Sequence, residues 1–133
     1  MKVEDIEGIG PVHAATLQGA GIHTSDALLD RAGPKAGRDA LAVETGISGK
    51  LLLEWANACD LMRIKGIGAQ FSDLLEAAGV DSAAELAQRN AANLAATFQE
   101  LNAARATTRR APTEEMVAAW ISQAKQLPRV VTH

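Results

Sequence analysis

The sequence predicts an all-α fold, because it is rich in alanine and poor in the residues that favour strands. Alanine accounts for 27 of the 133 residues, whereas valine and isoleucine together account for only 14. Alanine is the strongest helix former, and strands are built mainly from β-branched and aromatic residues. The scarcity of aromatic side chains also weakens any proposal of single-stranded nucleic-acid binding by stacking, which needs exposed rings. They are Trp55, Phe71, Phe98 and Trp120.

Length and cysteine content exclude several classes of protein. A chain of 133 residues that is 47% hydrophobic suffices for one domain, or for two very small ones that share a core. No apolar run approaches the roughly 18 residues of a membrane span, and the N-terminus lacks the pattern of a signal peptide. The single cysteine, Cys59, excludes an internal disulfide and a cysteine-cluster zinc site. We expect a soluble cytoplasmic protein.

An internal duplication is the strongest pattern in the sequence. Ile6–Gly10 reads IEGIG, and it recurs 58 positions later as Ile64–Gly68, which reads IKGIG. The same offset relates Ala20–Ile22 to Ala78–Val80. The sequence therefore predicts two copies of one helical unit.

The duplication also sets the boundary between the copies. Trp55 and Trp120 correspond at an offset of 65, so the second copy carries seven extra residues, which we assign to the segment 105–111. The first copy then comprises residues 1–62 and the second comprises residues 63–133.

Each copy is predicted to begin with a glycine turn and two helices. In the first copy the first helix starts at Pro11, whose missing N–H is tolerated in the first helical turn. It ends at Gly21, and its counterpart ends at Gly79, because glycine readily takes the positive φ of a helix C-terminus. Capping residues for a second, short helix follow: Thr24 or Ser25 in the first copy, and the capping box Ser82–Glu85 in the second.

A third and a fourth helix complete each copy. The spacing of Leu94, Phe98 and Leu101 predicts the third helix, whose counterpart covers Arg38–Thr45 and stops at Gly46. The fourth helix starts at Ser48 or Thr113 and carries a single apolar stripe, which is typical of a core face. The stripe comprises Leu51, Leu52, Trp55, Cys59 and Met62 in the first copy, and Met116, Val117, Trp120, Ala124 and Leu127 in the second.

The first glycine turn has too few residues before it for a preceding helix. We therefore expect the C-terminal helix, residues 113–127, to fold back and pack on the first hairpin. This would close the copies around a pseudo-twofold axis and bring residues 127–131 near residues 1–4.

The apolar-x-Gly-apolar-Gly turns, each followed by Ala-Gly-Ile or Ala-Gly-Val, resemble the helix-hairpin-helix motif. The whole chain is similar to a small bacterial family of tandem helix-hairpin-helix proteins classed as a domain of unknown function, and Trp120–Pro128 resembles its closing helix. The resemblance spans nearly the full length. It implies two pseudo-symmetric, SAM-like units in one compact helical bundle. It further implies contact with the DNA backbone without sequence preference, in some cases with a bound monovalent cation.

The second hairpin has the chemistry that phosphate contact requires. Its glycines permit a tight turn, and the amides that follow lie at a helix N-terminus, where unpaired N–H groups and the helix dipole favour an anion. Such contacts position a duplex without reading its bases. Alternatively, the hairpin is only a tight interhelical turn. The predicted phosphate-binding residues are Arg63, Lys65, Gly66, Ile67, Gly68 and Ala69.

The first hairpin is less suited to phosphate, because Glu7 stands where Lys65 stands in the second. Residues 1–62 carry five basic and nine acidic side chains, a net charge of −4, whereas residues 63–133 carry eight and seven, a net charge of +1. Any DNA binding should therefore be weak and salt-sensitive. Secondary candidates are Gly8, Ile9 and Gly10, together with Arg105, Arg109 and Arg110, which form either a phosphate-contacting arm or a solvated loop.

No constellation typical of catalysis is present. The chain has no Ser/His/Asp or Cys/His set, no phosphate-loop lysine motif and no metal cluster, and Asp81, the nearest counterpart of a glycosylase carboxylate, lies at a helix N-cap. His13 and His23 are interpreted as surface residues, and Cys59 as a buried small hydrophobe. We expect no enzyme and no cofactor beyond a monovalent cation at the second hairpin. The alternative to DNA binding is a protein-interaction or scaffold domain whose acidic first half meets a basic partner.

Overall fold

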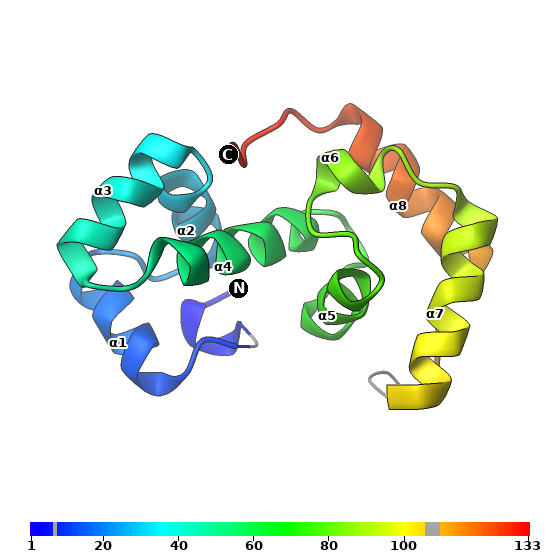
Figure 1. The fold of residues 1–133 in the computed structure, drawn as a ribbon, viewed down its shortest axis with the longest axis horizontal. Coiled ribbons are helices and arrows are strands. Elements are labelled where there is room, and N and C mark those ends of the chain that lie inside the picture. The colour runs from blue at the N-terminus through cyan, green and yellow to red at the C-terminus, as the bar shows by residue number, and fades with distance from the viewer. Residues whose placement is uncertain (7, 106–109) are drawn as a thin grey trace. The chain divides into compact units, whose positions relative to one another are not determined.

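The structure, a computed structural model, describes residues 1–6, 8–105 and 110–133. These residues form helices and contain no strand; their one β-type pairing is an isolated bridge between Lys2 and Thr24. The predicted all-α class is confirmed (Figure 1). No helix in the described ranges combines the length and the apolar character needed to cross a membrane.

The chain divides into two compact units. Unit 1 comprises Met1–Asp60 together with Val130–His133, and unit 2 comprises Leu61–Arg129. The boundary lies inside a helix, two residues before the boundary at residue 62 that the duplication suggests. The last four residues also differ from the prediction, because they belong to unit 1 and not to the second copy.

Unit 1 follows the predicted order of elements. Thr24 caps α2, since its Oγ1 accepts a hydrogen bond from the N–H of Ala27 at 3.2 Å, and α3 ends at Gly46 with φ of 73°. The core is formed by buried side chains such as Leu17, Leu41 and Trp55. The elements are η1 (Val3–Asp5, a 3₁₀-helix), α1 (Pro11–Gly19), α2 (Ser25–Ala32), α3 (Lys35–Thr45) and α4 (Gly49–Met62), whose last two residues lie in unit 2.

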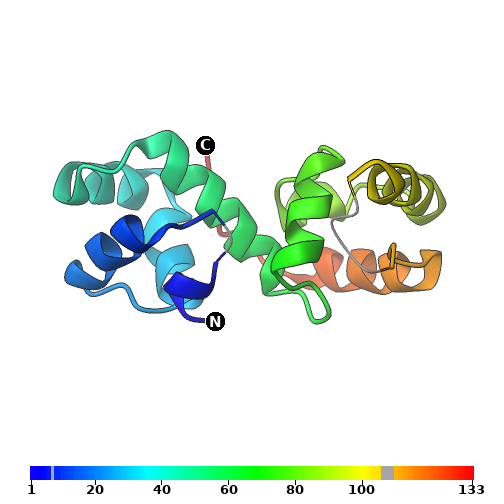
Figure 2. The ribbon, with the colours of Figure 1, turned by 90° about the horizontal axis from the view of Figure 1, so that it is seen from below.

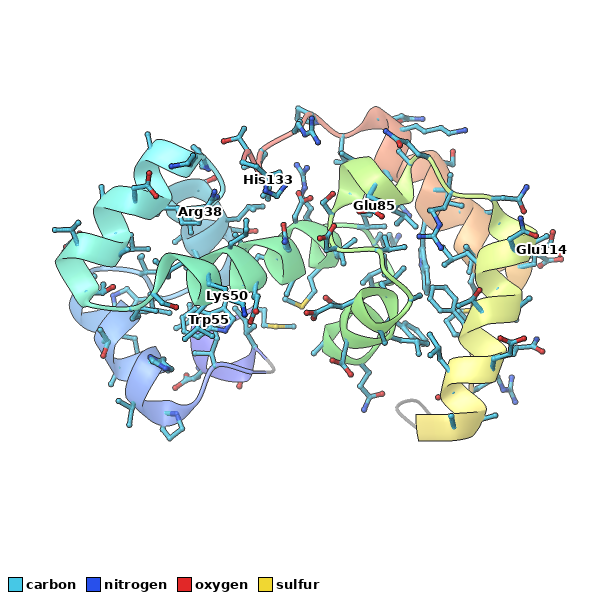
Figure 3. The ribbon with its side chains drawn as sticks, in the orientation of Figure 1. Arg38, Lys50, Trp55, Glu85, Glu114 and His133 are labelled. Atoms are coloured by element: carbon cyan, nitrogen blue, oxygen red, sulfur yellow. The ribbon has the colours of Figure 1, made fainter. Side chains whose placement is uncertain are left out.

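The C-terminal tail is tied to the turn between α2 and α3. Arg38 is 5% exposed, and its guanidinium donates to the carbonyl oxygens of Ala32 at 3.0 Å, Gly33 at 2.9 Å and Thr132 at 2.8 Å. The N–H of Thr132 donates to the oxygen of Gly33 at 3.0 Å, and its Oγ1 accepts from the N–H of Lys35 at 2.9 Å. Figure 3 labels Arg38 and the terminal residue of this tail. These hydrogen bonds of the tail are with the turn between α2 and α3. The predicted position of residues 127–131 near residues 1–4 stays a prediction.

Unit 2 also consists of helices joined by turns. Ser82 and Thr113 cap α6 and α8, each accepting a hydrogen bond at 3.2 Å from the N–H three residues later. Phe98 is fully buried and belongs to the unit 2 core. One predicted core residue is wrong: Met116 is 37% exposed, because the buried stripe of α8 starts one residue later. The elements are α5 (Ala69–Ala77), α6 (Ala83–Leu86), α7 (Ala91–Arg105) and α8 (Glu114–Gln126).

The closing helix α8 belongs to unit 2. Its buried residues Val117, Trp120 and Ile121 are part of the unit 2 core, and the helix packs on α6 and α7 (Figure 2). The sequence predicted that this helix would also pack on the first hairpin, and that stays a prediction. The apolar stripe of the helix finds a complementary surface within its own copy, on the helices that precede it.

Cys59 is a buried hydrophobe of the α4 stripe, as predicted, with 3% of its surface exposed. Burial is the main cause that raises the pKa of its thiol from 9.0 to about 12, and the nearby carboxylates of Asp26 and Asp60 raise it further. A thiol with such a pKa is protonated at neutral pH and is a poor nucleophile.

The raised pKa makes stability depend on pH above pH 9. In that range the unfolded thiol loses its proton and the folded thiol keeps it, so the free energy of unfolding falls by about 1.4 kcal/mol per pH unit until the folded thiol ionises. Between about pH 7.5 and about pH 10.5, the free energy of unfolding of the wild type should fall by about 2 kcal/mol more than that of Cys59→Ala. Urea unfolding at each pH measures both values. An equal fall in the free energy of unfolding of the two proteins would contradict the raised pKa of the Cys59 thiol.

Candidate functional site

The two glycine turns have matching backbone hydrogen bonds, 58 residues apart. Ile9 donates its N–H to the oxygen of Ile6 at 3.2 Å, and Ile67 donates to Ile64 at 3.1 Å. The first glycine of each turn has a positive φ, which is 90° at Gly8 and 99° at Gly66. The correspondence continues through α1 and α5. At the start of each helix, the N–H of Ala14 donates to the oxygen of Gly10, and the N–H of Ser72 donates to that of Gly68. After each helix, the N–H of Ile22 donates to the oxygen of Leu17, and the N–H of Val80 donates to that of Leu75.

The second turn presents an accessible helix N-terminus. Lys65, Gly66 and Gly68 are exposed, Ala69 is half-buried, and Ile67 is 4% exposed and belongs to the unit 2 core. Ile67 therefore anchors the turn, while its neighbours face solvent. The N-terminus of α5 has no side-chain cap, so its first amides are left for solvent or for a ligand. Five of the six predicted residues, the consecutive residues 65–69, lie at this helix end.

Two residues of the second hairpin are held by α8 and the residues after it. The N–H of Lys65 donates to Oε1 of Gln123 at 3.0 Å, and Nε2 of Gln123 donates back to the oxygen of Lys65 at 3.2 Å. The guanidinium of Arg63 donates to the oxygen of Pro128 at 2.7 Å. Arg63 therefore has a structural role, whereas Lys65 keeps its charged side chain on the surface while its backbone is fixed.

Trp120 of α8 lies directly beneath the same hairpin. A Cβ placed on Gly66 would come within 3.0 Å of Nε1 and 3.8 Å of Cδ1 of the indole. The ring also packs against Phe71 and Phe98, with centroid distances of 5.3 and 6.5 Å. The turn at Gly66 therefore needs glycine for two reasons, its positive φ and its closeness to the indole.

The first hairpin has the same turn without the same donors. Gly8 and Gly10 are exposed and Ile9 is buried, as in the second hairpin. Helix α1 begins with Pro11, however, which has no N–H to offer, whereas α5 begins with Ala69. A Cβ on Gly8 would meet none of the described atoms within 4 Å. The predicted repulsion of phosphate by Glu7 concerns a residue outside the described ones.

The remaining candidates belong to other segments of the chain or lie outside the described residues. Arg105 is the last residue of α7, and Arg110 is exposed beyond it. Arg109 lies outside the described residues. Asp81 precedes Ser82, the N-cap of α6. The pKa of Glu85 is raised, mainly by burial and next by a side-chain hydrogen bond with Asp81. In the described ranges no three His, Cys, Asp or Glu side chains come together as a metal site would require.

The comparisons with known proteins bear on the family. The model of a family described as a domain of unknown function (DUF4332) matches residues 7–127. The chain belongs to this family. The DUF4332 match begins at residue 7, inside the first glycine turn, includes the second turn and α8, and stops before the tail that Arg38 binds. No match was found among curated proteins or among solved structures.

Sequence reasoning missed two parts of the site. His13 is half-buried, with its ring 5.2 Å from that of Trp55, and Phe71 lies at the equivalent place beside Trp120. The offset of 58 between His13 and Phe71 is a signal that pointed to this equivalence. Gln123 carries no comparable signal, because its counterpart at an offset of 65 is Ala58.

Proposed function

We infer that the chain is a binding module whose second hairpin contacts the phosphate backbone of duplex DNA without reading its sequence. In this proposal the two glycine turns are helix-hairpin-helix motifs of two pseudo-symmetric units, and the chain is not an enzyme. The matching hydrogen bonds of the two turns support the motif assignment. The observation that carries the binding proposal is the uncapped, exposed N-terminus of α5 next to Lys65.

The electrostatics support weak binding at one hairpin only. The amides at the start of α5 and the positive end of the helix dipole attract an anion, and Lys65 adds a nearby positive charge. Each phosphate that the protein neutralises makes the binding constant fall more steeply with salt. With one hairpin engaged, binding should be weak and sensitive to salt, in keeping with the net charge of −3 for the chain.

We assign no cation to the second hairpin. A monovalent cation in such a turn would be held by backbone carbonyl oxygens. Two of these oxygens already accept hydrogen bonds, that of Ile64 from Ile67 and that of Lys65 from Gln123. The donors in the turn therefore suit an anion better than its acceptors suit a cation.

The sharpest test replaces Gly68 with aspartate. Gly68 has φ of −99°, and a Cβ there meets nothing within 4 Å, so the substitution fits the described backbone. Aspartate is a favoured N-cap residue, and its carboxylate would occupy the same amides that a phosphate would use. We expect Gly68→Asp to keep or slightly raise the melting temperature while weakening duplex binding at least about tenfold at about 20 mM salt. Fluorescence anisotropy with a labelled duplex measures the binding.

The matched control is Gly10→Asp in the first hairpin. Gly10 has φ of −74° and equally free space around a Cβ, so this variant adds the same charge and the same cap. Duplex binding by Gly10→Asp should equal that of the wild type within about twofold. Lys65→Glu should weaken binding as Gly68→Asp does. The proposal fails if the wild type does not bind at low salt, or if both aspartate variants bind like the wild type.

The alternative is a protein-interaction or scaffold domain with purely structural hairpins. The net charge of −4 on residues 1–62 favours it, because an acidic surface is suited to a basic partner. In that case the contacts of Trp120 and Gln123 with the second hairpin serve only to stabilise unit 2. Absence of duplex binding at low salt would favour this alternative.

A further inference from the structure

We propose that the turn between α2 and α3 is a docking site for an extended peptide segment, and that its partner is the C-terminal tail of a second copy of this chain. The tail, residues 130–133, occupies this site on its own chain in the structure. A second copy carries the identical segment, so the contacts already present define the ligand that fits. The inference concerns unit 1 and is independent of the proposed contact between the second hairpin and DNA.

The polar groups of the site bind the main chain of the tail. The guanidinium of Arg38 donates to the oxygen of Thr132 at 2.8 Å, and the N–H of Thr132 donates to the oxygen of Gly33 at 3.0 Å. An extended segment that gives and receives main-chain hydrogen bonds is a recurring mode of peptide recognition. Arg38 is 5% exposed and also donates to the oxygens of Ala32 and Gly33, which do not belong to the tail. Two of its three bonds are therefore independent of the tail, and the donor is preformed.

Two side chains of the tail give the site its selectivity. Oγ1 of Thr132 accepts a hydrogen bond at 2.9 Å from the N–H of Lys35, the first residue of α3. The N-cap of that helix, Pro34, makes no side-chain hydrogen bond, so a hydroxyl 97 residues beyond Lys35 supplies the cap. Val131 is 3% exposed, so an apolar side chain is buried next to this hydroxyl residue. The site thus fits valine followed by a residue with a hydroxyl group.

The turn also leaves space for the tail at Gly33. A Cβ on Gly33 would lie 2.8 Å from Cγ1 and 3.1 Å from the oxygen of Val130, and 2.6 Å from the oxygen of Leu29. The φ of Gly33 is −62°, so it is space and not backbone conformation that calls for glycine here. Because this residue has no side chain, the main chain of the tail lies close against the turn.

A short exposed link joins the tail to unit 2. The oxygen of Pro128, in unit 2, accepts a hydrogen bond from Arg63 at 2.7 Å, and Val130 is the first tail residue that belongs to unit 1. Arg129 lies between them and is exposed. A change of backbone direction at Arg129 would carry the tail to another copy while the bonds on both sides of the link stay the same in kind. Exchange of an identical terminal element between copies is a low-cost route to a dimer.

Exchange regains the contacts that it breaks, so concentration decides between the two arrangements. The chain's own tail competes at an effective concentration on the order of millimolar, which is typical of a short tether. Binding of a second tail is therefore strongest when the tail of the receiving chain cannot bind. Val131→Asp provides such a receiving chain, because docking of its tail would bury a carboxylate at a position that is 3% exposed.

The first test titrates a synthetic peptide with the sequence of residues 128–133 into isotope-labelled, full-length Val131→Asp. We expect the NMR amide signals of residues 32–38 to move and to saturate. A control peptide that carries Val131→Asp should bind at least about tenfold more weakly. Adding Arg38→Met to the receiving chain should weaken binding of the unchanged peptide about tenfold. No movement of these signals at about 10 mM peptide would overturn the proposal.

The second test asks whether a whole chain supplies the tail. Full-length Val131→Asp, which keeps the site, is mixed with full-length Arg38→Met, which keeps the tail. At about 1 mM of each chain, sedimentation equilibrium should show a heterodimer in the mixture and no dimer of either variant alone. Replacing the second chain with one that carries both substitutions should abolish the heterodimer. Peptide binding without a heterodimer would show that a second copy is the wrong partner.

A measurement on the wild type decides the matter even if Val131→Asp does not fold. Unlabelled peptide at about 10 mM is added to the isotope-labelled wild type. Because the peptide has the sequence of the tail, the amide signals of residues 32–38 should stay in place. Those of Val131 and Thr132 should move toward the positions of an unbound segment. Unchanged signals from the tail would overturn the proposal, since no added segment would then have replaced it.

Discussion

Replacing Arg38 with methionine is expected to lower the free energy of unfolding of unit 1 by about 3 kcal/mol. The guanidinium is 5% exposed and donates to three carbonyl oxygens, two in the turn between α2 and α3 and one on Thr132. Methionine fills a similar volume but donates nothing, so the buried oxygen of Ala32 loses this donor and the tail loses its attachment. Urea unfolding followed by circular dichroism measures the loss.

Two companion variants show whether the contact with the tail is the cause. Arg38→Lys should recover only part of the loss, because one ammonium group cannot match the planar set of donors that spans three oxygens. Deletion of residues 130–133 should also be destabilising, and the deletion combined with Arg38→Met should cost less than the sum of the two. A loss below about 0.5 kcal/mol for Arg38→Met would show that these hydrogen bonds contribute little.

Gly66→Ala is expected to destabilise unit 2 by about 3 kcal/mol, about twice the effect of Gly8→Ala in unit 1. Both glycines have positive φ, 99° and 90°, so alanine is strained at either position. Only at Gly66 would the new Cβ also come within 3.0 Å of a buried indole nitrogen, which must then move. Thermal unfolding of the two single variants compares them directly.

Coupling with Trp120 identifies the source of the difference. In a Trp120→Phe background the smaller ring leaves room for the methyl group, so Gly66→Ala should cost no more than Gly8→Ala does. A double-mutant cycle measures this coupling as a non-additive free energy. Equal costs for the two glycine variants in the wild-type background would rule out a contribution from the indole.

The local features of the fold were predictable from the sequence. Thr24, Ser82 and Thr113 cap their helices as predicted, each through a bond to the N–H three residues later. Gly21 and Gly79 take positive φ of 85° and 86° after the helices that they end. These interactions close within a few residues, so residue type and spacing suffice to predict them.

The candidate site was predictable only in part. The glycine turn, Lys65 and the start of α5 follow from the duplicated sequence. The donors and anchors supplied by α8 do not, because an apolar stripe shows that a helix face is buried but not what covers it. Arg38 was equally hidden: a basic residue in a helix is ordinarily solvated, and the oxygen of Thr132 that it binds lies 94 residues away.

The amino-acid sequence alone determined the helical class, the duplication and the ends of most helices, because these depend on neighbours within a few residues. Tertiary structure decided that α8 completes the second hairpin and that the tail returns to unit 1. Those choices depend on which apolar and polar surfaces fit each other among segments distant in sequence. The same choices set Gln123 on Lys65 and the indole of Trp120 next to Gly66, and they thereby define the surroundings of the second glycine turn.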